Sequence, residues 1–312
     1  MHRSDPESLT SPRSSAWPIA AVCAANVFLA TGPVFVRLAD TGPVAAAFWR
    51  IMLAAPVLFG AAFLLRERPV AAARGLWGVL AVAGIAFALD LGSWHIGILR
   101  TTLANSTLFG NSATLIYPIY GFIVARAWPT RTQGAALALA AVGGGMLLGR
   151  SAELSPQNLV GDLFCMLAGL LYAFYFILMA RVRQAMPPAS ALALSTLASA
   201  APLLALALLL GERVIPGDWT PLILVALFSQ LIGQGLLIYA IGHLPPLIVG
   251  LALLIQPVVS ATIGWVWFGE RLAAADMAGA VLIAVALVLV RRPERPAKVP
   301  LASHPTNPRS VA

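Results

Sequence analysis

Two charged side chains, Arg50 and Asp90, lie well inside long apolar stretches of this chain. If those stretches cross a bilayer, a charge at such depth is costly unless it faces protein, water or a ligand. Arg50 is seven residues into a predicted helix that begins near Pro43, about 10 Å below one boundary. Asp90 lies nine residues before Leu99 on a predicted helix of opposite direction, about 13 Å below the same boundary. We therefore expect the two charges to meet, either at a ligand site or as a pair that only fixes helix packing.

Amide side chains occur near the middle of other apolar stretches, and each needs a partner outside its own helix. These candidates for ligand contact are Asn26, Asn111, Gln230, Gln234 and Gln256. Direct bonding between helices would also satisfy each of them. Because they come from both halves of the chain and fall near one depth, the pattern favours a polar central cavity.

Aromatic side chains near the same depth could stack on a flat organic ligand. The candidates are Trp94, Tyr117 and Tyr239, with the apolar core or the interfacial belt as the alternative place for each. Phe87, Asp90 and Trp94 follow i, i+3, i+7 spacing, which puts them on one helical face. That face therefore combines an acid with two rings.

Sequence signals of other activities are missing. The chain has no Walker-type phosphate loop, HExxH motif, GxSxG elbow or Cys/His cluster, so we predict no cofactor, no metal site and no enzymatic activity. An acid–base pair of Asp90 and His95 would be the alternative, but a spacing of five puts them on different helical faces. The net charge of +8 is scattered through short loops and the tail, which argues against nucleic-acid binding.

The composition indicates a polytopic membrane protein, because only 10% of residues are charged and 60% are hydrophobic. Soluble domains carry about 25% charged residues. Apolar runs of about twenty residues are long enough to span a bilayer as helices. The ten predicted spans are 16–38, 43–65, 75–99, 102–124, 132–149, 159–180, 188–210, 219–241, 245–268 and 274–290.

The basic residues give the predicted orientation. With both termini in the cytoplasm, fourteen of the twenty basic residues lie inside and five lie outside, as the positive-inside rule requires. Five helices in each half is an odd number, so two similar halves must have opposite topology. The predicted domains are a disordered cytoplasmic tail (1–15), a first repeat (16–149), an external loop (150–158), a second repeat (159–290) and a disordered basic cytoplasmic tail (291–312).

Two stretches resemble the EamA-type repeat of the drug/metabolite transporter superfamily. In one, an apolar helix carries Pro257, followed by Gly269-Glu270 and, nine residues after the Glu, by Gly279. In the other, Gly161-Asp162-Leu163 leads into the segment 172–175 with the sequence YAFY, as in the opening helix of the repeat. The resemblance spans nearly the whole chain.

The resemblance implies an all-α carrier of ten transmembrane helices in two inverted five-helix repeats, with a small-molecule substrate bound near the midplane. We expect a bacterial inner-membrane exporter of small metabolites, first of all amino acids, with aromatic or other amphipathic ones favoured. Its partners would be the substrate, the lipid bilayer and, if transport is coupled, protons. The competing interpretation is a membrane enzyme or receptor subunit that transports nothing.

The two halves match the resemblance unequally. If Gly134 corresponds to Gly279, then Ala125 stands where the second half has Glu270. A symmetric role for Glu270 is therefore not expected. We expect it instead to contact Arg271 or another basic group, or to cap a helix.

Overall fold

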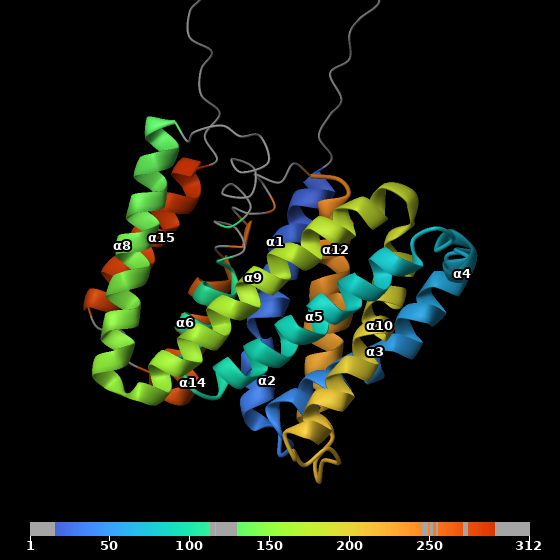
Figure 1. Cartoon of the computed structure of the whole chain (residues 1–312), viewed down its shortest axis with the longest axis horizontal. Helices are drawn as coiled ribbons and strands as arrows, with labels where there is room; N and C mark the ends of the chain where they lie inside the picture. The colour runs from blue at the N-terminus through green and yellow to red at the C-terminus, as the bar shows by residue number, and fades with distance from the viewer. Residues whose placement is uncertain are drawn as a thin grey trace, which may run out of the picture.

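The computed structural model describes residues 16–112, 116, 130–244, 249, 252–253, 255–270 and 274–290. Every regular element within these residues is a helix (Figure 1). The helices are α1 (Ala16–Ala30), α2 (Gly32–Leu38), α3 (Pro43–Leu64), α4 (Pro69–Ala72), α5 (Trp77–Ile98), α6 (Leu103–Gly110), α8 (Arg131–Leu154), α9 (Pro156–Ala185), α10 (Pro188–Leu209), α11 (Thr220–Leu224), the π-helix η1 (Val225–Gln234), α12 (Gly235–Ile241), α14 (Ile255–Phe268) and α15 (Ala274–Val290).

Six helical stretches in the described part of the chain are long and apolar enough to cross a membrane. They are Trp17–Leu38, Pro43–Leu64, Trp77–Ile98, Pro156–Ala185, Pro188–Leu209 and Thr220–Ile241. Three shorter apolar helices accompany them: Gly134–Met146, Ile255–Phe268 and Met277–Ala286. The prediction of an all-helical, multi-pass membrane protein is therefore confirmed.

The structure differs from the predicted segments at 150–158, and it describes only part of the span predicted at 102–124. The expected external loop at 150–158 is helical except at Ser155, because α8 continues to Leu154 and α9 begins at Pro156. Proline suits the first turn of a helix, and the Ser155 hydroxyl accepts a hydrogen bond from the Asn158 N–H at 3.1 Å. Of the span expected at 102–124, α6 is described only as far as Gly110.

Helices α3 and α10 are equivalent elements of the two halves. Both have 22 residues, and their bounds differ by 145 positions (188 − 43 and 209 − 64). Both begin with a proline and end in the same turn, in which a residue with positive φ follows the helix. That residue is Arg66 (φ 58) in the first half and Gly211 (φ 66) in the second.

Each of these turns directs a glutamate toward the other half of the molecule. The N–H of Glu67 bonds to Ala62 O at 2.8 Å and that of Glu212 to Ala207 O at 3.0 Å, the long bond of a Schellman motif. The Glu67 carboxylate accepts the Ser190 N–H at 2.7 Å, and the Glu212 carboxylate accepts the Ala45 N–H at 2.8 Å.

Ser190 and Ala45 are themselves 145 positions apart, so each half caps the first turn of the other half's helix. Helices α3 and α10 pack against each other. Because the start of each lies beside the end of the other, they run antiparallel, and the two halves are inverted. We call these two contacts the reciprocal caps.

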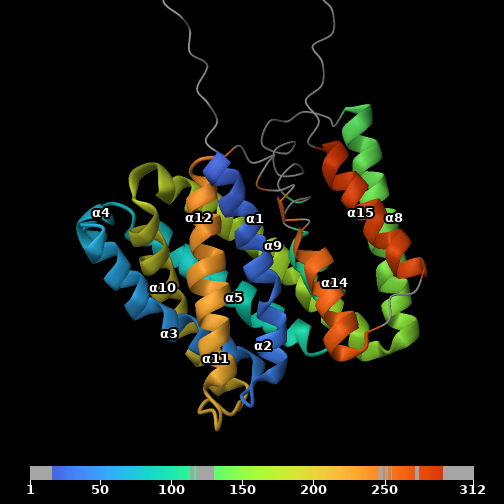
Figure 2. The ribbon, with the colours of Figure 1, turned by 180° about the vertical axis from the view of Figure 1, so that it is seen from behind.

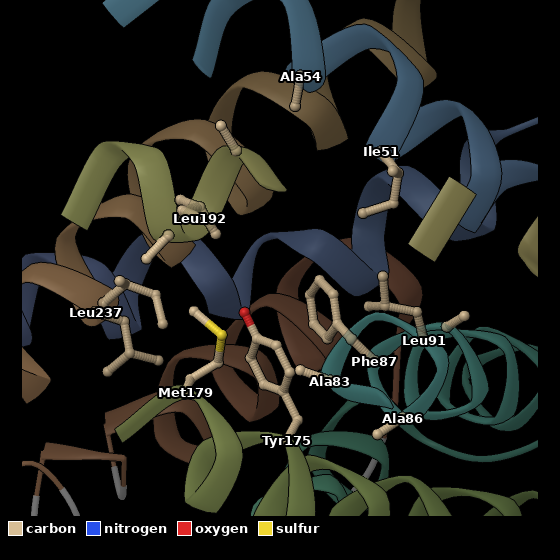
Figure 3. Close-up of a cluster of buried hydrophobic side chains, with 14 of the residues drawn as sticks. Ile51, Ala54, Ala83, Ala86, Phe87, Leu91, Tyr175, Met179, Leu192 and Leu237 are labelled. Atoms are coloured by element: carbon tan, nitrogen blue, oxygen red, sulfur yellow. The ribbon is translucent and has the colours of Figure 1, made fainter. Parts of the chain in front are cut away.

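The apolar core is shared between the halves. Figure 3 shows Phe87 and Tyr175 side by side, and their rings stack at 4.5 Å between centroids. Around them lie side chains from both halves, including Ile51 of α3, Leu192 of α10 and Leu237 of α12. Helices α8 and α15 form a separate pair that joins the bundle through α9 (Figures 1 and 2).

Candidate functional site

A cavity of about 410 Å³, counting the part that is open to solvent, lies between the two halves. The first half supplies Leu29, Arg50, Phe87, Asp90, Leu91, Trp94, Thr107, Gly110 and Asn111, and the second half supplies Tyr172, Gln234 and Gln256. A cavity with a mixed polar and apolar lining therefore lies between the halves.

Among the described residues that line this cavity Arg50 is the only arginine, and it is only 2% exposed. Its Nε donates to Gln230 Oε1 at 3.0 Å, and Gln230 Nε2 donates to Thr196 Oγ1 at 3.1 Å. This chain of bonds fixes the guanidinium from the second half. Among the described residues Arg50 Nη1 has no hydrogen-bond partner, so it can still donate to a ligand.

The expected direct pairing of Arg50 with Asp90 is wrong. Both side chains line the cavity, but no ion pair within 4.0 Å joins these two described residues. The reason is that Arg50 is instead hydrogen-bonded to Gln230 of the π-helical segment η1. Depth along the helices alone did not predict that η1 lies beside Arg50. The two charges therefore face a common space without a direct ion pair between them.

The rings on the face of Asp90 form an aromatic wall, as the spacing on α5 predicts. Trp94 and Phe87 both line the cavity, on either side of Asp90 along the helix. The Trp94 Nε1 donates to Ser106 O at 2.9 Å, which fixes the indole against α6. The Arg50 guanidinium carbon lies 5.9 Å from the centre of the Trp94 ring. A ligand between these groups would meet a cation, an acid and two flat apolar faces.

The second half lines the cavity with uncharged polar groups. The Tyr172 hydroxyl donates to Gln234 Oε1 at 3.0 Å, while Gln234 Nε2 has no partner among the described residues. Gln256 Nε2 donates to Asn26 Oδ1 at 2.7 Å, and Asn26 Nδ2 donates to Val22 O at 2.7 Å. Asn26 therefore lies behind Gln256, outside the cavity wall, and holds it.

The remaining predicted site residues lie outside the cavity wall or outside the described residues. Gln230 is buried and supports Arg50 from behind. Tyr239 stacks on His243 with ring centres 4.2 Å apart and does not line the cavity. Tyr117 lies outside the described residues. Tyr172 was missed, although it stands in the segment that carries the family resemblance, because one aromatic residue in a helix does not distinguish core from cavity.

Neither acid–base pairing nor metal binding finds support in the described residues. The ring Nδ1 of His95 lies 3.1 Å from Pro43 O, and the side chain is fully buried outside the cavity wall, away from Asp90. The described part of the chain brings no three His, Cys, Asp or Glu side chains together in a way that could hold a metal ion.

Glu270 contacts a basic group, which is Arg37. Arg37 Nη1 donates to Glu270 Oε1 at 2.6 Å, and the Leu103 N–H at the start of α6 donates to Glu270 Oε2 at 3.0 Å. Glu270 thus pairs with a cation and caps a helix at once. These contacts lie where α2 and α5 end, and we call this the Arg37 end of the bundle.

A helical membrane protein whose two inverted halves enclose a polar cavity has the architecture of a secondary transporter. The chain belongs to the EamA-like transporter family, whose model matches residues 16–149 and again residues 159–292. It is a multi-pass membrane transporter of small solutes.

One solved structure, described only as a crystal structure of a protein, shares the fold. It superposes with a TM-score of 0.63 over 89% of this chain and 98% of its own, at 19% sequence identity. No curated protein matches the chain.

Proposed function

We propose that this transporter exports small amphipathic metabolites, first of all amino acids, with aromatic amino acids favoured. The observation that carries the proposal is the unpaired Arg50 Nη1, which shares one cavity with the Asp90 carboxylate. Separated opposite charges in one cavity match a zwitterion better than a neutral solute or a simple ion. The rings of Phe87, Trp94 and Tyr172 provide flat apolar contacts for the substrate side chain.

In this arrangement Arg50 binds the substrate carboxylate and Asp90 binds its ammonium group. Arginine is well suited to the first role because its planar donors match a carboxylate. Gln234 Nε2 supplies a further donor to the carboxylate or to a polar side chain. The bound substrate thereby gives Arg50 and Asp90 each an ionic partner, which they do not provide for each other.

Transport would proceed by alternating access, with ten spans in two inverted repeats that rock about the site. Asp90 is the only acid in the described wall of the cavity, which makes it the candidate proton carrier if export is coupled to the proton gradient. If export is driven by the substrate gradient alone, flux will not depend on an imposed pH difference.

The test is flux in proteoliposomes loaded with labelled phenylalanine, leucine or serine. We expect export of amino acids, strongest for phenylalanine, with weak competition by phenethylamine, which lacks the carboxylate, and by phenylpropionate, which lacks the ammonium group. Equal competition by either analogue, or folded protein that moves no amino acid of the panel, would refute the proposal. Empty liposomes and the Arg213→Gln variant, altered at an exposed ion pair, serve as controls.

We further propose that the Arg37 end faces the outside of a bacterial inner membrane and that both termini are cytoplasmic. Supporting this, α1 begins and α15 ends at the same end of the bundle, opposite the Arg37 end (Figure 1). Single cysteines at Ile215 and Val70, which are 63% and 66% exposed, provide matched reporters at the two ends. In intact cells an impermeant thiol reagent should label Ile215→Cys only. The reverse pattern would overturn the orientation.

A further inference from the structure

A largely buried ion pair between Arg37 and Glu270 joins the two halves outside the cavity. The two side chains are 17% and 14% exposed, so their ion pair of 2.6 Å is largely shielded from water. Arg37 also donates to the carbonyl oxygens of Ile98 at 3.3 Å and of Thr101. Phe268 lies below the guanidinium, with 5.0 Å from Cζ to the ring centre. Arg37 therefore ties the end of α14 to the corner between α5 and α6.

The start of α6 depends on this contact. The Glu270 carboxylate accepts the N–H of Leu103, the first residue of α6, at 3.0 and 3.2 Å. An acidic group at this position stabilises a helix because it satisfies a free N–H and the positive end of the helix dipole. We call the three groups Arg37, Glu270 and the Leu103 N–H the one-sided latch.

The latch and the cavity are joined by two helices. Thr107, one turn after Leu103 on α6, lines the cavity, and Gln256 on α14 lines it as well. One helical turn rises about 5.4 Å. A displacement of α6 away from α14 at the latch therefore also moves side chains of the cavity wall.

The latch has no equivalent in the other half of the sequence. The offset of 145 positions between α3 and α10 relates Glu270 to Ala125 and Arg37 to Val182. Although Arg183 follows Val182 in the sequence, alanine at the position of Glu270 cannot form an ion pair. The reciprocal caps of Glu67 and Glu212, by contrast, are made by equivalent residues on both sides.

This difference separates fixed from changing contacts. In an inverted-repeat transporter, the state open to the opposite side arises when the two halves exchange conformations. Contacts made by equivalent residues can survive that exchange, whereas a contact with no equivalent belongs to one state only. We propose that the one-sided latch closes the cavity at the Arg37 end and must break for the cavity to open there, while the reciprocal caps stay intact.

The test measures accessibility and does not depend on the substrate. Thr107→Cys, in a background with Cys23→Ala and Cys165→Ala, reports on the cavity, and an impermeant thiol reagent is applied only at the Arg37 end. Glu270→Gln and Arg37→Gln should each accelerate labelling about tenfold or more, because the state open to that end becomes more populated. Unchanged labelling in both folded variants would overturn the proposal.

Two controls are matched to the latch. Arg213→Gln removes an exposed ion pair of 3.7 Å with Asp40, and Glu212→Gln weakens a reciprocal cap at the Arg37 end. Both should leave the labelling rate within twofold of the parent, and equal acceleration in either would refute a specific role of the latch. If neither glutamine variant folds, Arg37→Lys keeps the charge but loses the forked donors. It should accelerate labelling severalfold, and a parental rate would overturn the proposal.

Discussion

The two halves of this transporter have equivalent helices but contribute different side chains to the cavity. The first half supplies Arg50, Asp90 and Trp94, and the equivalent positions of the second half, by the offset of 145, are Ser195, Gly235 and Tyr239. Only the last of these is a large polar side chain, and it stacks on His243 away from the cavity.

One pair of equivalent residues does line the cavity in both halves, since Asn111 and Gln256 are also 145 positions apart. Within the cavity wall this one amide position follows the internal symmetry, whereas Gln234, Arg50 and Asp90 have no equivalent there. The symmetric helix arrangement permits two states that open to opposite sides. The asymmetric binding site allows a polar substrate to keep one orientation in both states. The first expectation from this comparison is that the charges of the first half matter most for transport.

The largest effect is expected from Arg50→Gln. Loss of a hydrogen bond to a charged group costs about 1.5–3 kcal/mol, which corresponds to a loss of amino-acid flux of about 10- to 150-fold at low concentration. Gln234→Leu, in the second half, should lose only about fivefold, since a neutral hydrogen bond contributes about 1 kcal/mol. Initial export rates in proteoliposomes at matched protein content measure both. Equal losses would contradict the assignment of the main anchor to the first half.

A smaller and equal effect is expected from the reciprocal caps. Glu67→Ala and Glu212→Ala each remove the acceptor at a helix start, so each should lower the free energy of unfolding by about 1–2 kcal/mol. Thermal unfolding in one detergent gives the comparison, and Arg213→Gln is the control because an exposed ion pair contributes little. A large loss in only one of the two variants would show that the caps are equivalent in geometry but not in energy.

The smallest effect concerns the turn that precedes each cap. Arg66 adopts φ 58, where a side chain costs about 1 kcal/mol, and glycine occupies the equivalent position 211 with φ 66. Arg66→Gly should therefore stabilise the protein by up to about 1 kcal/mol, and Gly211→Ala should destabilise it by a similar amount. Unfolding midpoints measure both changes. A loss of stability in Arg66→Gly would mean that the arginine makes compensating contacts.

The sequence by itself determined the class of the protein, the positions of most spans and the candidate polar residues. Hydrophobic run length requires no tertiary information, because a helix in a bilayer must satisfy its own backbone. The mid-span position also selected Arg50, Asp90, Asn111, Gln234 and Gln256, which line the cavity, but by the same criterion it selected Asn26 and Gln230, which lie behind the wall.

Only the tertiary structure decided which partner each polar group has. Depth along a helix does not give rotation about its axis, so the sequence placed Arg50 opposite Asp90 while the fold gives it Gln230. Glu270 likewise had several possible contacts, and the meeting of α2, α6 and the end of α14 selected Arg37 and the Leu103 N–H. Contacts between residues 233 or 167 positions apart depend on how helices pack, which no local pattern encodes.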